Sequence, residues 1–302
     1  MSDTMIALRR QIHGAGDLQS VVRTMKALAA SSIGQYEQSV SALADYSRTV
    51  ELGLSVCFRK APLIGFIGDQ RKRLHAEAIG AVVFGSDQGL VGQFNEVIAE
   101  YTVKTLASLP GHPRVWAVGE RVQKQLADAG VSLQGFFPVP NSVKTITPLV
   151  GQILLESETG SSRGEILELH LFYNRPTSRA GYSPVNHRLL PLDEHWQMEL
   201  ASRPWPTENL PEIIGPTTST LRALIHEYLF VSLFRACAES LASENASRLS
   251  AMQRAEKNID ELLEDLNRRF HQIRQRGIDE ELFDVISGFE ALATPTQPPD
   301  GP

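Results

Sequence analysis

At 302 residues the chain has room for one large domain or two ordinary ones. Hydrophobic residues make up 42% and charged residues 21%, which excludes wholesale disorder, and no apolar run approaches the roughly 20 residues that span a bilayer. The net charge of −6 argues against a protein that coats nucleic acid, and the two cysteines, Cys57 and Cys237, do not make a disulfide framework.

The first predicted element is a long helix. No proline occurs before Pro62, and an interior proline would cost a helix about 3 kcal/mol. From Leu18 to Leu54, ten steps between apolar or small residues cover 36 positions, a period of 3.6 that marks one helix face. The stripe is Leu18, Val22, Met25, Ala29, Ser32, Tyr36, Val40, Leu43, Ser47, Val50 and Leu54. We expect a helix over 5–60 with this face buried.

The middle of the chain alternates short apolar runs with helical stretches. The ranges 79–84, 114–118, 131–137 and 165–173 have the pattern of strands, and 94–109, 120–129 and 143–156 that of helices. Such alternation predicts a mostly parallel sheet with covering helices, a Rossmann-like α/β domain that we place at 76–200. We interpret the proline-rich stretch 184–216 as the return to a second long helix.

The second long helix is predicted at 217–290, where no proline interrupts the chain. Nine steps between apolar residues cover 31 positions, a mean near 3.44 that is typical of a coiled-coil seam. The seam is Ala242, Ala246, Leu249, Met252, Ala255, Ile259, Leu262, Leu266, Phe270 and Ile273. Each apolar stripe needs cover, so we expect 5–60 and 217–290 to form an antiparallel coiled-coil shaft. The Pro-rich tail, 292–302, is predicted to be disordered.

The predicted fold class is therefore α/β: a long antiparallel two-helix coiled coil from the N- and C-terminal segments, plus a central Rossmann-like α/β domain.

A glycine-rich segment follows the first predicted strand. Gly85, Gly89 and Gly92 have the spacing G-x-x-x-G-x-x-G, which differs from the dinucleotide pattern G-x-G-x-x-G, and no Gly-Lys-Ser/Thr follows. We therefore interpret these glycines as a structural turn between strand and helix, with phosphate binding as the less favoured alternative.

Residue patterns of catalysis do not emerge. The eight histidines show no H-E-x-x-H spacing, and there is no G-x-S-x-G nucleophile elbow. We predict no catalytic residue, no cofactor and no metal site. A basic cluster, Arg268, Arg269, Arg274 and Arg276, is explained either by a solvated helix surface or by contact with acidic loops of a partner.

Three separated segments resemble the gamma subunit of F-type ATP synthases. They are 9–32, which ends in Val-Arg-Thr-Met-Lys-Ala-Leu-Ala-Ala-Ser-Ser; 86–95, Ser-Asp-Gln-Gly-Leu-Val-Gly-Gln-Phe-Asn; and 233–291, with Glu-Ser-Leu-Ala-Ser-Glu-Asn-Ala-Ser-Arg-Leu. The sequence departs from the family pattern at Ser32, Gln88, Val91, Asp279 and Phe289. These departures favour a divergent version, that of an alternate bacterial ATPase.

The resemblance implies a central stalk without catalytic residues of its own. The shaft would turn inside a ring of three α and three β subunits, bind the epsilon subunit and the membrane c-ring, and couple ion-driven rotation to ATP synthesis or hydrolysis on β. The expected location is the cytoplasmic face of the bacterial inner membrane, as a peripheral membrane protein.

The same resemblance implies two groups of site residues. The expected coupling contacts to β are Arg23, Met25 and Lys26, with Arg274 and Gln275 on the opposite helix. A mostly apolar bearing tip is expected at Leu282, Val285, Ile286 and Phe289.

Two other functions fit the composition. One is a nucleotide-binding α/β enzyme whose helical arms dimerise it, which predicts saturable nucleotide binding. The other is a helical tether or scaffold unrelated to rotation, which predicts a self-associated rod.

Overall fold

The computed structural model describes residues 2–60, 78–162, 168–177, 181–192, 194–209 and 211–293. Its helices are α1 (Ser2–Lys60), α3 (Phe94–Ser108), α4 (Glu120–Asp128), α5 (Val143–Ser162), α6 (Glu194–Ser202) and α7 (Thr217–Ala293). Its strands are β1 (Ala78–Phe84), β2 (His112–Val118), β3 (Leu133–Phe137), β4 (Glu168–Thr177) and β5 (Gly181–Leu190). Most of the predicted tail, 294–302, lies outside the described residues.

The two terminal helices are very long, as predicted. Helix α1 has 59 residues and α7 has 77, and neither contains a proline. The chain divides into two compact units, one of residues 1–27 with 252–302 and one of residues 28–251. This grouping cuts across the predicted division into 5–60, 76–200 and 217–290, which stays a prediction.

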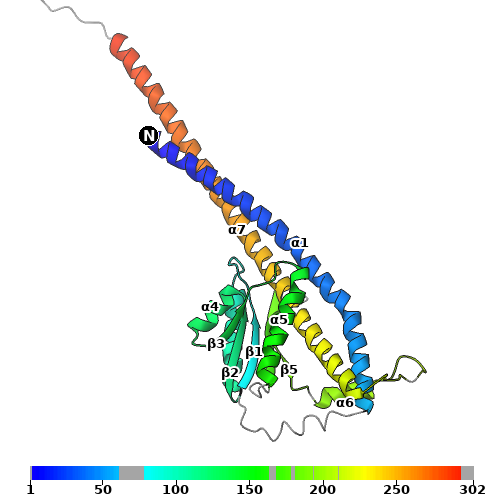
Figure 1. The fold of residues 1–302 in the computed structure, drawn as a ribbon. Helices are drawn as coiled ribbons and strands as arrows, with labels where there is room; N and C mark the ends of the chain where they lie inside the picture. The colour runs from blue at the N-terminus through cyan, green and yellow to red at the C-terminus, as the bar shows by residue number, and fades with distance from the viewer. Residues whose placement is uncertain are drawn as a thin grey trace, which may run out of the picture. The chain divides into compact units, whose positions relative to one another are not determined.

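The first unit is an antiparallel pair of helices (Figure 1). Arg9 of α1 stacks over the ring of Phe270, and Gln19 donates a hydrogen bond to Asp260. A step of ten residues forward along α1 therefore corresponds to a step of ten residues backward along α7, as antiparallel packing requires. The core of this unit combines Leu8, Ala15 and Leu266 with the half-buried Ile12, Leu263, Phe270 and Ile273. Leu262, expected in the seam, is 49% exposed, because Leu263 takes the inward position.

The second unit is built on a five-stranded sheet with the order β3-β2-β1-β4-β5. The β1–β2, β1–β4 and β2–β3 pairs are parallel, and β5 adds an antiparallel edge to β4. This confirms the predicted Rossmann-like, mostly parallel sheet. The stretch 184–216, interpreted as a mere return, instead contains α6 and most of β5, whose Pro184 is tolerated because β5 is an edge strand.

Helices cover both faces of the sheet. Leu171 and Tyr173 of β4 point to the face packed by α5 and α7, together with Tyr36 of α1. Phe172, between them, points to the face packed by α3 and α4. The α7 helix thus contributes Leu233, Cys237 and Leu241 to the largest core of this unit.

Candidate coupling surface, bearing end and strand-to-helix turn

Two of the predicted coupling residues are engaged within the chain. The Arg23 Nε donates to Oε1 of Glu256 at 3.0 Å, and the Lys26 Nζ donates to Oε2 of the same carboxylate at 2.5 Å. Arg23 keeps 58% of its side chain exposed and Lys26 keeps 35%. Glu256 therefore joins both cations of α1 to α7, and part of each remains open to solvent.

This double pairing changes the acidity of Glu256. Hydrogen bonds from Lys26 and then from Arg23 hold the pKa of the Glu256 carboxyl below its usual value. A lowered pKa means that the ionised carboxylate supports the folded helix pair above the unfolded-state pKa. That support is lost as the pH falls through the folded-state pKa.

The remaining α1 residues extend the surface. Met25 is half-buried, whereas its helix neighbours Leu18 and Val21 are 60% and 56% exposed. We expected Leu18 in the buried stripe. The 3.6-residue spacing placed it there, but the face of α1 that meets α7 in this unit passes through Leu8, Ile12 and Ala15 instead. Leu18 is therefore an exposed apolar residue, contrary to the prediction, and Val21 is a further one that the sequence reasoning did not consider.

Arg274 and Gln275 do not lie opposite Arg23 and Lys26. Glu256 is the residue opposite those cations, and Arg274 lies 18 positions further along α7, about 27 Å at 1.5 Å per residue. Both Arg274 and Gln275 are exposed. The five predicted coupling residues therefore occupy two levels of the helix pair, and the structure does not bring them into one cluster.

The residues of the predicted bearing tip are exposed. Every residue from 278 to 289 is exposed, including Leu282 (57%), Val285 (64%), Ile286 (45%) and Phe289 (75%). The register explains why: with Arg9 level with Phe270, the first residue of α1, Ser2, is level with position 277. The end of α7 extends beyond α1. Ile278 and Phe283 are further exposed apolar residues there, which the sequence reasoning left out.

The glycine turn after β1 is tightly packed. A Cβ on Gly85 would lie 2.3 Å from Cβ of Val122, whereas one on Gly89 would have no neighbour nearer than 3.8 Å. Gly92 has a φ of 59°, in the left-handed region that favours glycine. Gly85 is thus required for close packing and Gly92 for backbone conformation, and Gly89 has neither constraint.

Polar side chains of the same segment bind the chain's own backbone. Asp87 accepts the Glu120 N–H at 2.9 Å with one oxygen and the Val139 N–H at 2.9 Å with the other. Asn95 accepts the Ser86 N–H and donates to the Ser86 hydroxyl. Glu120 begins α4, so a carboxylate already occupies this helix N-terminus, where an incoming phosphate would bind. This arrangement disfavours the nucleotide-binding alternative.

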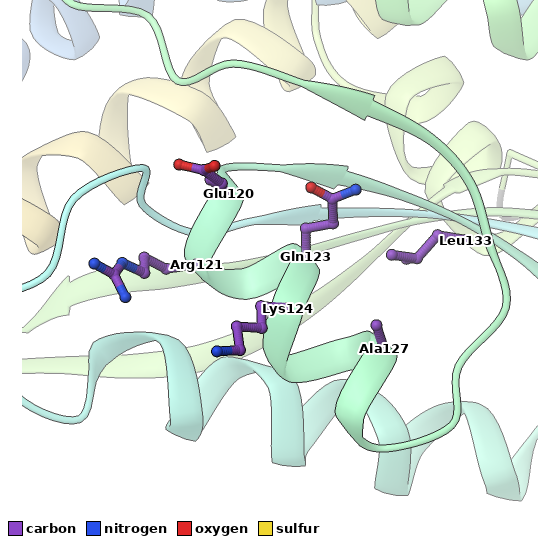
Figure 2. A pocket seen from close by; sticks show the side chains of 6 residues that line it. All are labelled: Glu120, Arg121, Gln123, Lys124, Ala127 and Leu133. Atoms are coloured by element: carbon purple, nitrogen blue, oxygen red, sulfur yellow. The ribbon is translucent and has the colours of Figure 1, made fainter.

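A pocket of about 450 Å³ lies nearby, along α4 and the start of β3. Its lining residues are Glu120, Arg121, Gln123, Lys124, Ala127 and Leu133. Figure 2 shows the Arg121 and Lys124 side chains extending to one side of α4 and Leu133 lying on the other. The polar groups do not converge on one point, as they would in a small-molecule site.

The long paired helices and the Rossmann-like sheet define a stalk-type protein. Within the described ranges no helix has the length and apolar character needed to cross a membrane.

Comparison with known proteins agrees with this class. A family model described as ATP synthase matches residues 4–292. The ATP synthase gamma chain of Mycolicibacterium paratuberculosis is 27% identical, over 97% of this chain and 99% of the relative. That of Clavibacter michiganensis is 28% identical, over 94% and 96%. A chain in the Euglena gracilis mitochondrial ATP synthase has a TM-score of 0.64 at 17% identity, with both chains fully covered.

The chain belongs to this family and is a gamma subunit of an F-type ATP synthase, a component of its central stalk.

Proposed function

We propose that this gamma subunit is the rotating shaft that couples the membrane c-ring to the catalytic sites of the β subunits, without catalytic residues of its own. The observation that carries the proposal is the helix pair: α7 extends beyond α1 and exposes apolar residues over 278–289. Such a surface is costly in water and fits an apolar sleeve formed by other subunits. Apolar contacts are non-directional, so they allow turning without breaking specific bonds.

The shape of the helix pair suits a ring of three catalytic sites. Two different helices have no threefold symmetry, so each β subunit meets a different surface. Converting a 1:99 balance of two states into 99:1 takes about 5.5 kcal/mol of differential contact energy. One exposed ion pair supplies about 0–1 kcal/mol. The coupling energy is therefore spread over many contacts, including Arg23, Met25, Lys26, Arg274 and Gln275.

The expected partners are three α and three β subunits, the epsilon subunit and the c-ring. The Euglena match belongs to an assembly of OSCP, F1 and the c-ring, which supports the F1 and c-ring partners. The proposed location is the cytoplasmic face of the bacterial inner membrane, as a peripheral protein. Identities of 27–28% to bacterial gamma chains support a divergent member of the family. Its assignment to an alternate version of the complex rests on the departures at Ser32, Gln88, Val91, Asp279 and Phe289.

Co-purification with subunit counting tests this function most directly. The full chain is co-expressed with the α and β subunits of its own complex, and the copies in the purified assembly are counted by native mass spectrometry. One copy per three β subunits is expected. A self-associated rod that binds neither subunit would overturn the proposal and favour the tether. Saturable nucleotide binding by the chain alone, measured by calorimetry, would favour the enzyme.

A further inference from the structure

One stretch of α7 buries polar atoms that have no protein partner. Among the described residues, five buried side-chain atoms lack a hydrogen bond, and four belong to the nine positions 240–248. They are Ser240 Oγ, Ser243 Oγ, Glu244 Oε2 and Arg248 Nε. Ser240, Ser243 and Glu244 are each 5% exposed or less. Natural proteins leave few such groups unsatisfied, so their gathering on one segment needs a cause.

The four atoms lie on one side of the helix. At 100° per residue, positions 240, 243, 244 and 248 fall within a sector of about 140°. Ser247, in the same sector, donates a hydrogen bond to the Val91 carbonyl at 2.6 Å. At Ser247 this side of α7 therefore contacts the turn after β1.

The chemistry of the four atoms is mutually complementary. Glu244 Oε1 already accepts a bond from Arg248 Nη2 at 2.5 Å, which leaves the other carboxylate oxygen as an acceptor and Nε as a donor. The serine hydroxyls can both donate and accept. An anion would be repelled by Glu244 and a cation by Arg248, whereas water joins donors to acceptors at no cost in charge.

We infer that this side of α7 is internally hydrated: ordered water bonds the second Glu244 oxygen and the Arg248 Nε, and water also bonds the hydroxyls of Ser240 and Ser243, which lie up to about two helical turns away. The site binds water as a fixed part of the fold and holds the buried ion pair in place.

The direction in which Ser243→Ala changes the unfolding midpoint distinguishes a hydrated site from a dry one. If Ser243 bonds water, Ser243→Ala breaks that bond and lowers the unfolding midpoint of the full-length chain. If the hydroxyl is dry and unpaired, its removal relieves a desolvation cost, and the midpoint stays the same or rises. The lowered midpoint is expected, and either other result overturns the inference.

Ser157→Ala is the matched control. Ser157 is also a buried helical serine, but its hydroxyl donates to the Leu154 carbonyl at 2.9 Å. It reports the change in unfolding midpoint for losing a satisfied hydroxyl, and the midpoint of Ser243→Ala should change in the same direction.

Direct observation provides a second readout. A structure of the assembled complex, at a resolution that shows ordered water, should place a water oxygen within hydrogen-bond distance of both Glu244 Oε2 and Arg248 Nε. Side chains turned to bond other protein atoms there, with no water between them, would refute the site.

Discussion

The turn after β1 and the end of α7 differ in where their stabilising partners come from. In the turn, Asp87 and Asn95 bind the chain's own backbone, and Gly85 fits against Val122 with no room for a methyl group. Over 278–289 every residue is exposed, although several are large and apolar. The turn is therefore stabilised from within the chain, whereas the proposed function requires another protein to cover the exposed end of α7.

The largest effect is expected from a substitution that disrupts the turn after β1. Gly85→Ala places a Cβ 2.3 Å from Cβ of Val122, and both atoms belong to packed elements that must move apart. We expect a loss of about 3 kcal/mol in the free energy of unfolding, near the upper end for overpacking. Chemical denaturation of the full chain measures it. Gly89→Ala is the control, since its Cβ would meet nothing within 3.8 Å. Equal stability of the two variants would contradict the packing argument.

The next largest effect is expected from removing the carboxylate that accepts hydrogen bonds from two backbone N–H groups. Asp87→Ala leaves the N–H groups of Glu120 and Val139 without their acceptor, so we expect a loss of about 2 kcal/mol. Asp128→Ala, an exposed aspartate at the other end of α4, should leave stability almost unchanged. If Asp87→Ala also bound nucleotide by calorimetry, the view that this carboxylate occupies the phosphate position would be strengthened. A fully stable Asp87→Ala would show that the two bonds contribute little.

The sequence predicted the elements better than it predicted the surfaces. The absence of proline indicated both long helices, and alternating apolar runs indicated β1 to β4 nearly at their observed bounds. β5 was missed in part because Pro184 argues against a strand, and only its edge position makes that proline harmless.

The candidate site was less predictable because it depends on pairing between distant segments. Periodicity placed Leu18 and Leu262 in the buried seam, yet both are about half exposed or more. Which side of a helix is buried at a given level depends on the partner's register, and spacing alone did not determine it at these two positions. The resemblance selected Arg23 and Lys26, but their pairing with Glu256 across the two helices required the fold.

The exposed end of α7 should show the opposite behaviour from the turn. The double variant Ile286→Ser, Phe289→Ser should leave the unfolding midpoint of the free chain unchanged, because both side chains are already in water. Binding to the α and β subunits should weaken by about tenfold or more, as two apolar side chains lose burial. Asp284→Ser, in the same exposed segment, is the control and should alter neither quantity. A lowered midpoint in the free chain would show that these residues are covered from within.

A smaller effect concerns the pH dependence of the helix pair. The pKa of Glu256 is lowered by Lys26 and Arg23, so its stabilising effect is complete above the unfolded-state pKa of about 4.3 and declines as the pH falls through the folded-state value. Glu256→Gln should therefore lower the unfolding midpoint at neutral pH and have little effect in acid. Glu264→Gln, at an exposed position of the same helix, should show no such difference. A gap between wild type and Glu256→Gln that persists in acid would contradict the ion-pair explanation.

The smallest single effects are expected at the proposed coupling residues, and they separate two kinds of contact. Arg274 is exposed, so Arg274→Ala should leave the free chain's stability unchanged and reduce coupled ATP synthesis less than about fivefold, the range of one exposed ion pair. Arg23 also binds Glu256, so Arg23→Ala should reduce coupling similarly and weaken the helix pair as well. The two positions lie on different levels, and their effects in the double variant should multiply. Complete loss of synthesis in an Arg274→Ala complex that still assembles would mean that one contact carries the coupling, because a distributed surface tolerates the loss of any one member.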